Sequence, residues 1–108
     1  MPIQLHPAAD SELDAASDWY EEQRLGLGGL FDSAVRQALR DIAANPDRWP
    51  FWPGLLHTPP IRRFLLPEHP FALPYLVRDE DVVVLAIAHL RRRPDYWLPR
   101  ATPSPRRP

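Results

Sequence analysis

The chain has 108 residues, of which 44% are hydrophobic, so it can build one compact domain with a modest core and has no room for a second. It holds no cysteine, which excludes disulfides and thiolate metal sites, and no apolar run long enough to cross a membrane; we expect a cytoplasmic protein without a signal peptide. The net charge of −1 hides an asymmetry: residues 1–47 carry nine acids and three arginines, whereas residues 48–108 carry ten arginines and five acids. This asymmetry indicates either an acidic or polyanionic partner or a fold that is complementary to itself.

The first half of the chain predicts a short strand followed by two helices. Residues 3–5 have strand character, and Pro7 suits the first turn of a helix that runs to about Leu25. The glycines within residues 26–29 predict a turn after it. A second helix is expected over residues 30–44, because its apolar residues recur at helical spacing on one stripe.

An aromatic, proline-rich segment, NPDRWPFWPG (45–54), follows the second helix and predicts an ordered loop. Trp49, Phe51 and Trp52 are too apolar for a flexible linker. Two interpretations stay open for these three residues: they cover the core, or they form an aromatic patch that binds a partner.

Three strands are expected in the second half, at residues 61–66, 71–78 and 82–89. The connectors between them are so short that neighbouring strands must be antiparallel. Pro74 lacks a backbone N–H, so we expect a bulge or an unpaired stretch beside it. The predicted fold class is therefore α+β, with an N-terminal strand and a helical hairpin packed on an antiparallel β-meander. Residues 99–108, which include four prolines, are expected to be a disordered tail.

Several kinds of site are excluded by what the sequence lacks. It has no phosphate-binding loop, dinucleotide fingerprint or HExxH motif, and its four histidines stand singly, without metal-ligand spacing. We therefore expect no metal centre and no cofactor.

The remaining candidates for chemistry are basic and aromatic residues on the predicted strands and after them. Arg62 and Arg63 open one strand, and we expect one of the two to face away from the helices. The segment 91–93 holds three more arginines and follows the last strand, so the sequence predicts two separate basic regions, the first of them beside Arg78. Arginine binds phosphate bidentately and keeps its charge.

Two residues are candidates for catalysis on such a phosphate. His89 is the candidate by its ordinary pKa, and Tyr96 could position a phosphate or stack on a base. The alternative is that His89 ends a strand while Tyr96 and Trp97 close one end of the core.

Five segments of the sequence together resemble a known family. They are the strand segments RRFLL, FALPYLV and VVVLAIAH, the ending RRRPDYW, and the helical segment AASDWYEEQRLGLGGLFDSAVRQALRDIAANPDRWP. They are similar to the RelE/ParE superfamily of toxins from type II toxin–antitoxin systems, and within it to the ParE, plasmid-stabilisation branch. The resemblance covers about residues 3–98, so we expect a single toxin domain at residues 1–98.

The resemblance implies a toxin that a cognate antitoxin, encoded beside it, holds inactive in a hetero-oligomer. ParE-like members are associated with poisoning DNA gyrase, whereas RelE-like members cut messenger RNA in the ribosomal A site. Arg62, Arg63 and Tyr96 fill part of the RelE pattern, but that pattern also uses lysine and this chain has none. His89, Arg91, Arg92 and Tyr96 match only the closing motif of the ParE branch.

Three hypotheses follow. The first is a toxin that binds gyrase without catalysis of its own; the second is a ribosome-dependent endoribonuclease with His89 and Tyr96 as catalytic candidates; the third is a module that binds its antitoxin and poisons nothing. Expected antitoxin contacts are Trp49, Phe51 and Trp52. Expected target-binding residues are Arg62, Arg63, Arg91, Arg92, Arg93, Tyr96 and Trp97.

Overall fold

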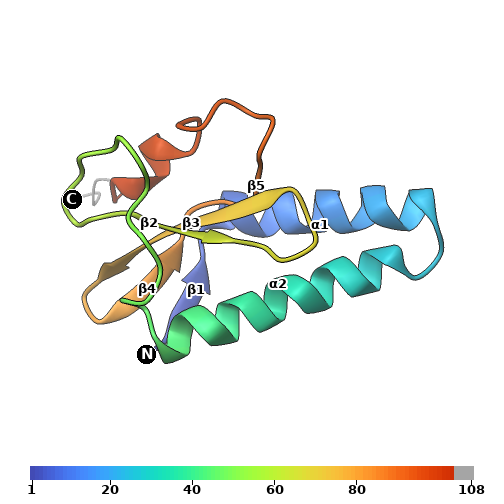
Figure 1. Cartoon of the computed structure of the whole chain (residues 1–108), viewed down its shortest axis with the longest axis horizontal. Coiled ribbons are helices and arrows are strands. Elements are labelled where there is room, and N and C mark those ends of the chain that lie inside the picture. Colours follow the sequence, from blue (N-terminus) through green and yellow to red (C-terminus); the bar gives the residue numbers. More distant parts are fainter. Residues whose placement is uncertain (104–108) are drawn as a thin grey trace, which may run out of the picture.

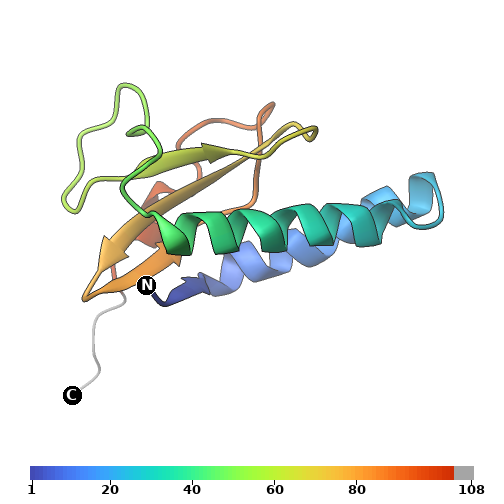
Figure 2. The same ribbon diagram turned by 60° about the horizontal axis from the view of Figure 1, so that its bottom comes forward.

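A computed structural model describes residues 1–103 of the chain and confirms the α+β fold class (Figure 1). Helices α1 (Pro7–Gln23) and α2 (Leu27–Ala44) form a hairpin along one side of a small sheet, and the tip of the hairpin extends beyond the sheet (Figure 2). No helix in the described part of the chain has the length and hydropathy that a membrane span requires.

Helix α2 begins at Leu27, three residues earlier than predicted, because only one of the three glycines in the junction forms the turn. Gly26 has a φ of +94°, in the left-handed region that favours glycine. The carboxylate of Glu21 accepts hydrogen bonds from the backbone N–H groups of Gly26 and Gly28, which satisfies free donors at the start of α2. Gly28 also lets the helices approach closely: a Cβ there would lie 2.6 Å from the carbonyl oxygen of Ser17.

The sheet consists of β1 (Ile3–Leu5), β2 (Arg62–Leu65), β3 (Phe71–Arg78), β4 (Asp81–Val84) and β5 (Ala88–His89). Its order is β1-β4-β3-β2, with β5 paired to β3. Strand β1 runs parallel to β4, and the other pairs are antiparallel. The predicted meander is therefore present, and the N-terminal strand adds one edge to it.

The predicted strand 82–89 is wrong as a continuous element, since residues 85–87 separate β4 from β5. Tyr75 pairs with Val84, and Ala72 pairs with Ala88. Between these two pairs, β3 contributes residues 73–74 and the opposing segment contributes residues 85–87, so two residues face three. One residue is extra, as in a β-bulge. The bulge lies beside Pro74. The carbonyl oxygen of Pro74 accepts a hydrogen bond from the backbone N–H of Leu85, but Pro74 has no N–H with which to donate a second hydrogen bond to the same segment. This is the irregularity that Pro74 predicts.

Each face of the sheet carries its own apolar cluster. On one face, the helices cover Phe64, Leu73, Tyr75 and Val84 with residues such as Phe31, Val35 and Ile42. On the other face, Trp97 is completely buried with Leu76, Leu85 and Ala88. Complete burial of a large apolar side chain stabilises the fold by roughly 1.5–3 kcal/mol, so Trp97 fixes the C-terminal segment on that face.

The first residues of the predicted tail are ordered, which corrects the expectation for 99–108. Leu98–Ala101 form a short 3-10 helix, and Ala101 is buried beside Trp97. The carbonyl oxygen of Ala101 accepts a hydrogen bond from the Arg78 guanidinium. Residues 104–108 lie outside the described part of the chain.

Candidate functional site

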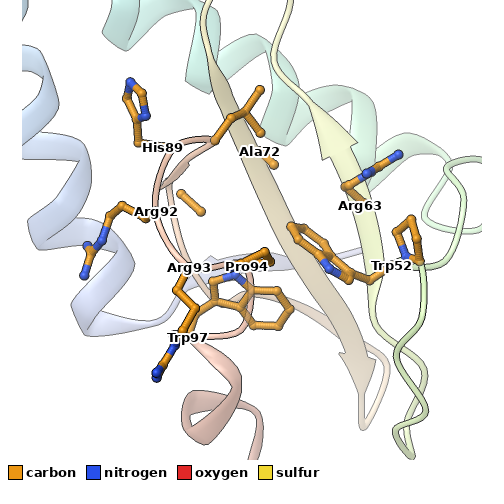
Figure 3. Close-up of a pocket in the computed structure, with 11 residues that line it drawn as sticks. Trp52, Arg63, Ala72, His89, Arg92, Arg93, Pro94 and Trp97 are labelled. Atoms are coloured by element: carbon orange, nitrogen blue, oxygen red, sulfur yellow. The ribbon is translucent and has the colours of Figure 1, made fainter.

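A cavity of about 340 Å³ lies on the face of the sheet that carries Trp97 (Figure 3). Its volume is at the small end of the range for ligand pockets, ~300–1,000 Å³. The alanines Ala72 and Ala88 on β3 and β5 leave room for it, because larger side chains at those positions would fill the space. The lining residues are Trp52, Pro53, Arg63, Ala72, Ala88, His89, Leu90, Arg92, Arg93, Pro94 and Trp97, with three arginines and no acid.

Arg63 belongs to this cavity, whereas Arg62 does not. Because neighbours on a strand face opposite sides, Arg63 points to the Trp97 face, with its guanidinium carbon 5.8 Å from the centre of the Trp52 ring. Arg62 donates hydrogen bonds to the carbonyl oxygens of Asp47 and Trp49, at 3.0 and 2.7 Å, and so holds the loop after α2. The prediction that the two arginines diverge is confirmed, and Arg62 is occupied with the fold.

The two predicted basic regions are partly one, which corrects that expectation. Ala72 pairs with Leu65 of β2 on one side and with Ala88 of β5 on the other. The register therefore places Arg63 across the cavity from Arg92 and Arg93 (Figure 3). Arg62, and Arg78 at the far end of β3, remain apart from this group.

The arginines after β5 differ in how they are paired. Arg92 is 3.7 Å from Glu12 and Arg93 is 3.2 Å from Asp95; the two arginine side chains are 57% and 80% exposed. The pair of Arg93 is exposed on both sides and contributes only about 0–1 kcal/mol, whereas Arg92 pairs with a carboxylate that is only 17% exposed. Arg63 and Arg91 form no salt bridge within residues 1–103.

Two buried N–H donors in the cavity walls have no acceptor in the described structure: Nε of Arg63 and Nε1 of Trp97. An unsatisfied buried donor costs about 1–3 kcal/mol. Because neither atom is accessible, it is the three lining arginines that favour an anionic group from another molecule in the cavity.

A polar centre beside the site that sequence reasoning missed is Glu12 of α1. Its carboxylate accepts hydrogen bonds from the Tyr96 hydroxyl at 2.8 Å, from both terminal nitrogens of Arg100 at 2.9 and 3.1 Å, and from the backbone N–H of Ile87 at 3.1 Å. The signal that could have revealed it is its position: Glu12 shares the inward stripe of α1 with Ala9 and Leu13. A carboxylate on an apolar stripe needs partners.

Tyr96 is therefore engaged inside the molecule. Burial raises its pKa to about 12, and the hydrogen bond and charge of Glu12 act in the same direction, against Arg92 and Arg100. The phenol stays protonated at neutral pH, so it is a hydrogen-bond donor and no base. The guanidinium carbon of Arg92 lies 3.7 Å from the centre of the Tyr96 ring.

The two candidate catalytic side chains do not line one cavity. His89 is half-buried in the cavity wall, where its Nδ1 accepts a hydrogen bond from the backbone N–H of Arg91 at 3.1 Å and its ring packs edge-on against Phe71. Tyr96 is not among the lining residues. The alternative in which His89 ends a strand and Trp97 closes a core agrees with these contacts.

The three aromatic residues expected to contact a partner do not form one patch. Trp49 packs on Phe64 in the core between helices and sheet, with ring centres 4.9 Å apart. Trp52 packs on Trp97 on the opposite face, at 4.8 Å. Of the three residues only Phe51 is exposed, with 54% of the residue accessible to solvent. Trp49 and Trp52 cover the two cores, and a partner contact by Phe51 stays a prediction.

Part of the charge asymmetry is balanced within the molecule. Acids of the first half pair with arginines of the second: Glu12 with Arg92 and Arg100, and Asp47 with Arg62 at 3.8 Å. The expected open basic rim is therefore partly neutralised by α1. Of the arginines that line the cavity, only Arg63 forms no salt bridge in the described structure.

The chain is similar to known proteins in sequence and in fold. A family model described as the ParE toxin of the type II toxin–antitoxin system parDE matches residues 3–94. A solved structure described as the chromosomal ParDE TA system from P. aeruginosa aligns with a TM-score of 0.72 and 18% identity, covering 84% of this chain and 97% of that one. At this identity the structural match supports the fold. A comparison with curated proteins finds no match.

Proposed function

Because the chain belongs to the ParE toxin family of type II toxin–antitoxin systems, we propose that it inhibits growth by binding and poisoning DNA gyrase and that a cognate antitoxin neutralises it. The observation on this chain that supports the proposal best is the cavity rimmed by Arg63, Arg92 and Arg93 with no acid among its lining residues. Such a rim favours an anionic partner surface, which gyrase with its bound DNA offers.

The proposed target-binding surface consists of this cavity and the exposed segment beside it. Arg91, Arg92 and Arg93 supply the accessible charge, while Trp97 and Tyr96 hold that segment against the sheet. The chain acts by binding in this proposal. His89 and Tyr96 do not line one cavity, and the Tyr96 hydroxyl is engaged with Glu12, so the contacts give less support to a ribonuclease that uses both.

An acidic antitoxin segment fits the same charge. The outer edge of β2 offers a second feature for binding: Phe51 pairs with Arg62 at its start, and beyond this bridge Leu65 lies exposed on the edge strand. An exposed edge with an apolar side chain suits the addition of an extended segment from a partner.

The test is expression of the chain without antitoxin in a sensitive bacterium. We expect growth arrest, induction of the SOS response and accumulation of cleaved DNA held by gyrase. An arrest of translation before any DNA damage would contradict gyrase as the target and favour messenger RNA cleavage. Normal growth would contradict toxicity altogether.

A charge-matched pair of triple variants locates the surface. Replacing Arg91, Arg92 and Arg93 with alanine is expected to abolish toxicity while the protein keeps its circular dichroism spectrum. The control replaces Arg24, Arg36 and Arg40, three exposed arginines on the helical hairpin, and removes the same charge elsewhere. Full toxicity in the first variant, or equal loss in both, would contradict the proposed surface.

A further inference from the structure

Glu12 connects three parts of the chain that are distant in sequence. It lies on α1, and its carboxylate contacts Ile87 in the bulge, Tyr96 after the basic segment and Arg100 in the 3-10 helix. The bulge makes the first contact possible, since the N–H of Ile87 is released from the ladder with β3. The side chain is only 17% exposed, so these hydrogen bonds form where water competes little.

The same carboxylate controls Arg92 by two routes. The direct route is the ion pair at 3.7 Å, which is longer than the 2.9 Å contact between Glu12 and Arg100. The indirect route is the ring of Tyr96, which Glu12 holds through the hydroxyl and on which the Arg92 guanidinium rests. Because Arg100 makes the shorter contact with Glu12, Arg92 is held mainly through the Tyr96 ring, and it remains one of the residues that line the cavity.

We propose that Glu12 is a positioning residue of the target-binding surface, which fixes Tyr96 and thereby orients Arg92 toward the partner. The role of the target rests on the proposed function above, whereas the positioning itself is a property of the folded chain. This role makes the Glu12 carboxylate favourable for binding an anionic partner. A simple count of charges would treat the same carboxylate as opposing such binding.

The experiment compares Glu12→Gln with Glu22→Gln, a matched loss of one carboxylate from an exposed position of the same helix. In the purified full chain, ¹³Cζ-tyrosine NMR resolves the three tyrosines during an alkaline titration. Glu12→Gln removes the charge that raises the pKa of Tyr96 and leaves Arg92 and Arg100, which lower it. The Tyr96 titration is therefore expected to move to lower pH, while Tyr75 stays at about 12 and Glu22→Gln changes neither.

Toxicity provides the second measurement. Glu12→Gln is expected to lose as much toxicity as Arg92→Ala, and the double variant to lose no more than either alone, because both changes remove the same oriented group. Tyr96→Phe, which keeps the ring and removes the link to Glu12, is expected to lose part of the toxicity. This variant keeps the test valid if Glu12→Gln does not fold.

Three results would overturn the inference: an unchanged Tyr96 titration in Glu12→Gln, toxicity equal to that of Glu22→Gln, or independent losses that multiply in the double variant. A wild-type chain that poisons nothing would refute the proposed function separately. In that case the titration still decides whether Glu12 holds Tyr96.

Discussion

At the scale of single residues, the hydroxyl groups of two tyrosines hold distant segments of the chain together. The Tyr75 hydroxyl donates to the carbonyl oxygen of Pro46 at 2.6 Å, and the Tyr96 hydroxyl donates to Glu12 at 2.8 Å. Burial is the first cause of the raised pKa in both, and each reaches about 12. Both links depend on a proton that an exposed tyrosine loses near pH 10.

These values predict a loss of stability at high pH. In the unfolded chain both phenols ionise near pH 10, whereas in the folded protein they stay protonated to about pH 12. Their contribution is therefore complete below pH 10 and decreases as pH rises toward 12. We expect the urea midpoint to fall over this interval and to fall less in Tyr96→Phe. A midpoint that is constant between pH 10 and 12 would contradict the assignment.

The residues of the site were predictable to the extent that chemistry alone selects them. Arg63, Arg92 and Arg93 stand out in the sequence, and the structure places them around one cavity. Glu12 and Arg100 were missed because their relation is set by packing across 88 positions of the chain. Arg62 has the same residue type as its neighbour, and only the register of β2 separates their roles.

At the scale of elements, the helical hairpin depends on one glycine where its helices meet. Gly28 and Gly29 are adjacent in the first turn of α2, yet a Cβ at Gly28 would meet Ser17 at 2.6 Å, whereas a Cβ at Gly29 would meet nothing within 4 Å. Composition alone treats the two glycines as one turn signal. Their different surroundings come from the crossing of α1 and α2, which local sequence does not specify.

The pair gives a controlled test of that crossing. Gly28→Ala is expected to lower the free energy of unfolding by about 1–3 kcal/mol, because the helices must separate to admit the methyl group. Gly29→Ala is expected to raise it by roughly 0.5–1 kcal/mol, since alanine favours the helix and nothing obstructs it. Chemical denaturation of both variants measures the difference. Equal effects of the two substitutions would show that the close approach is absent in solution.

The strands show where periodicity succeeds and where it stops. Strand β3 has the predicted limits, 71–78, because short turns bound a run of apolar residues. The break between β4 and β5 does not appear in VVVLAIAH, whose residues are apolar throughout; it is caused by Pro74 on the neighbouring strand. The 3-10 helix after Trp97 was missed for a similar reason: burial against Trp97 orders a proline-rich segment that composition assigns to a tail.

At the scale of the whole molecule, the charge asymmetry has two components. Salt bridges between the halves, from Glu12 and Asp47, neutralise some arginines and stabilise the fold. Among the arginines of the cavity, Arg63 forms no salt bridge in the described structure and Arg93 forms only an exposed one, while Arg92 belongs to both components. A calculation of net charge per half cannot separate these components, because both contribute equally to the sum.

The salt dependence of antitoxin binding is expected to measure the second component, which is the charge of the arginines beside the cavity. If the exposed arginines beside the cavity carry the attraction, the dissociation constant rises with ionic strength, since exposed charges are screened over about 10 Å at 0.1 M salt. The variant with alanine at 91, 92 and 93 should bind more weakly at low salt and show a flatter dependence, whereas the variant at 24, 36 and 40 should keep the wild-type slope. Titration calorimetry of the purified chain with its antitoxin across a salt series measures all three slopes. Binding of the wild-type chain that does not change with salt would assign the interface to exposed apolar residues such as Phe51 and Leu65, and the arginines to the target alone.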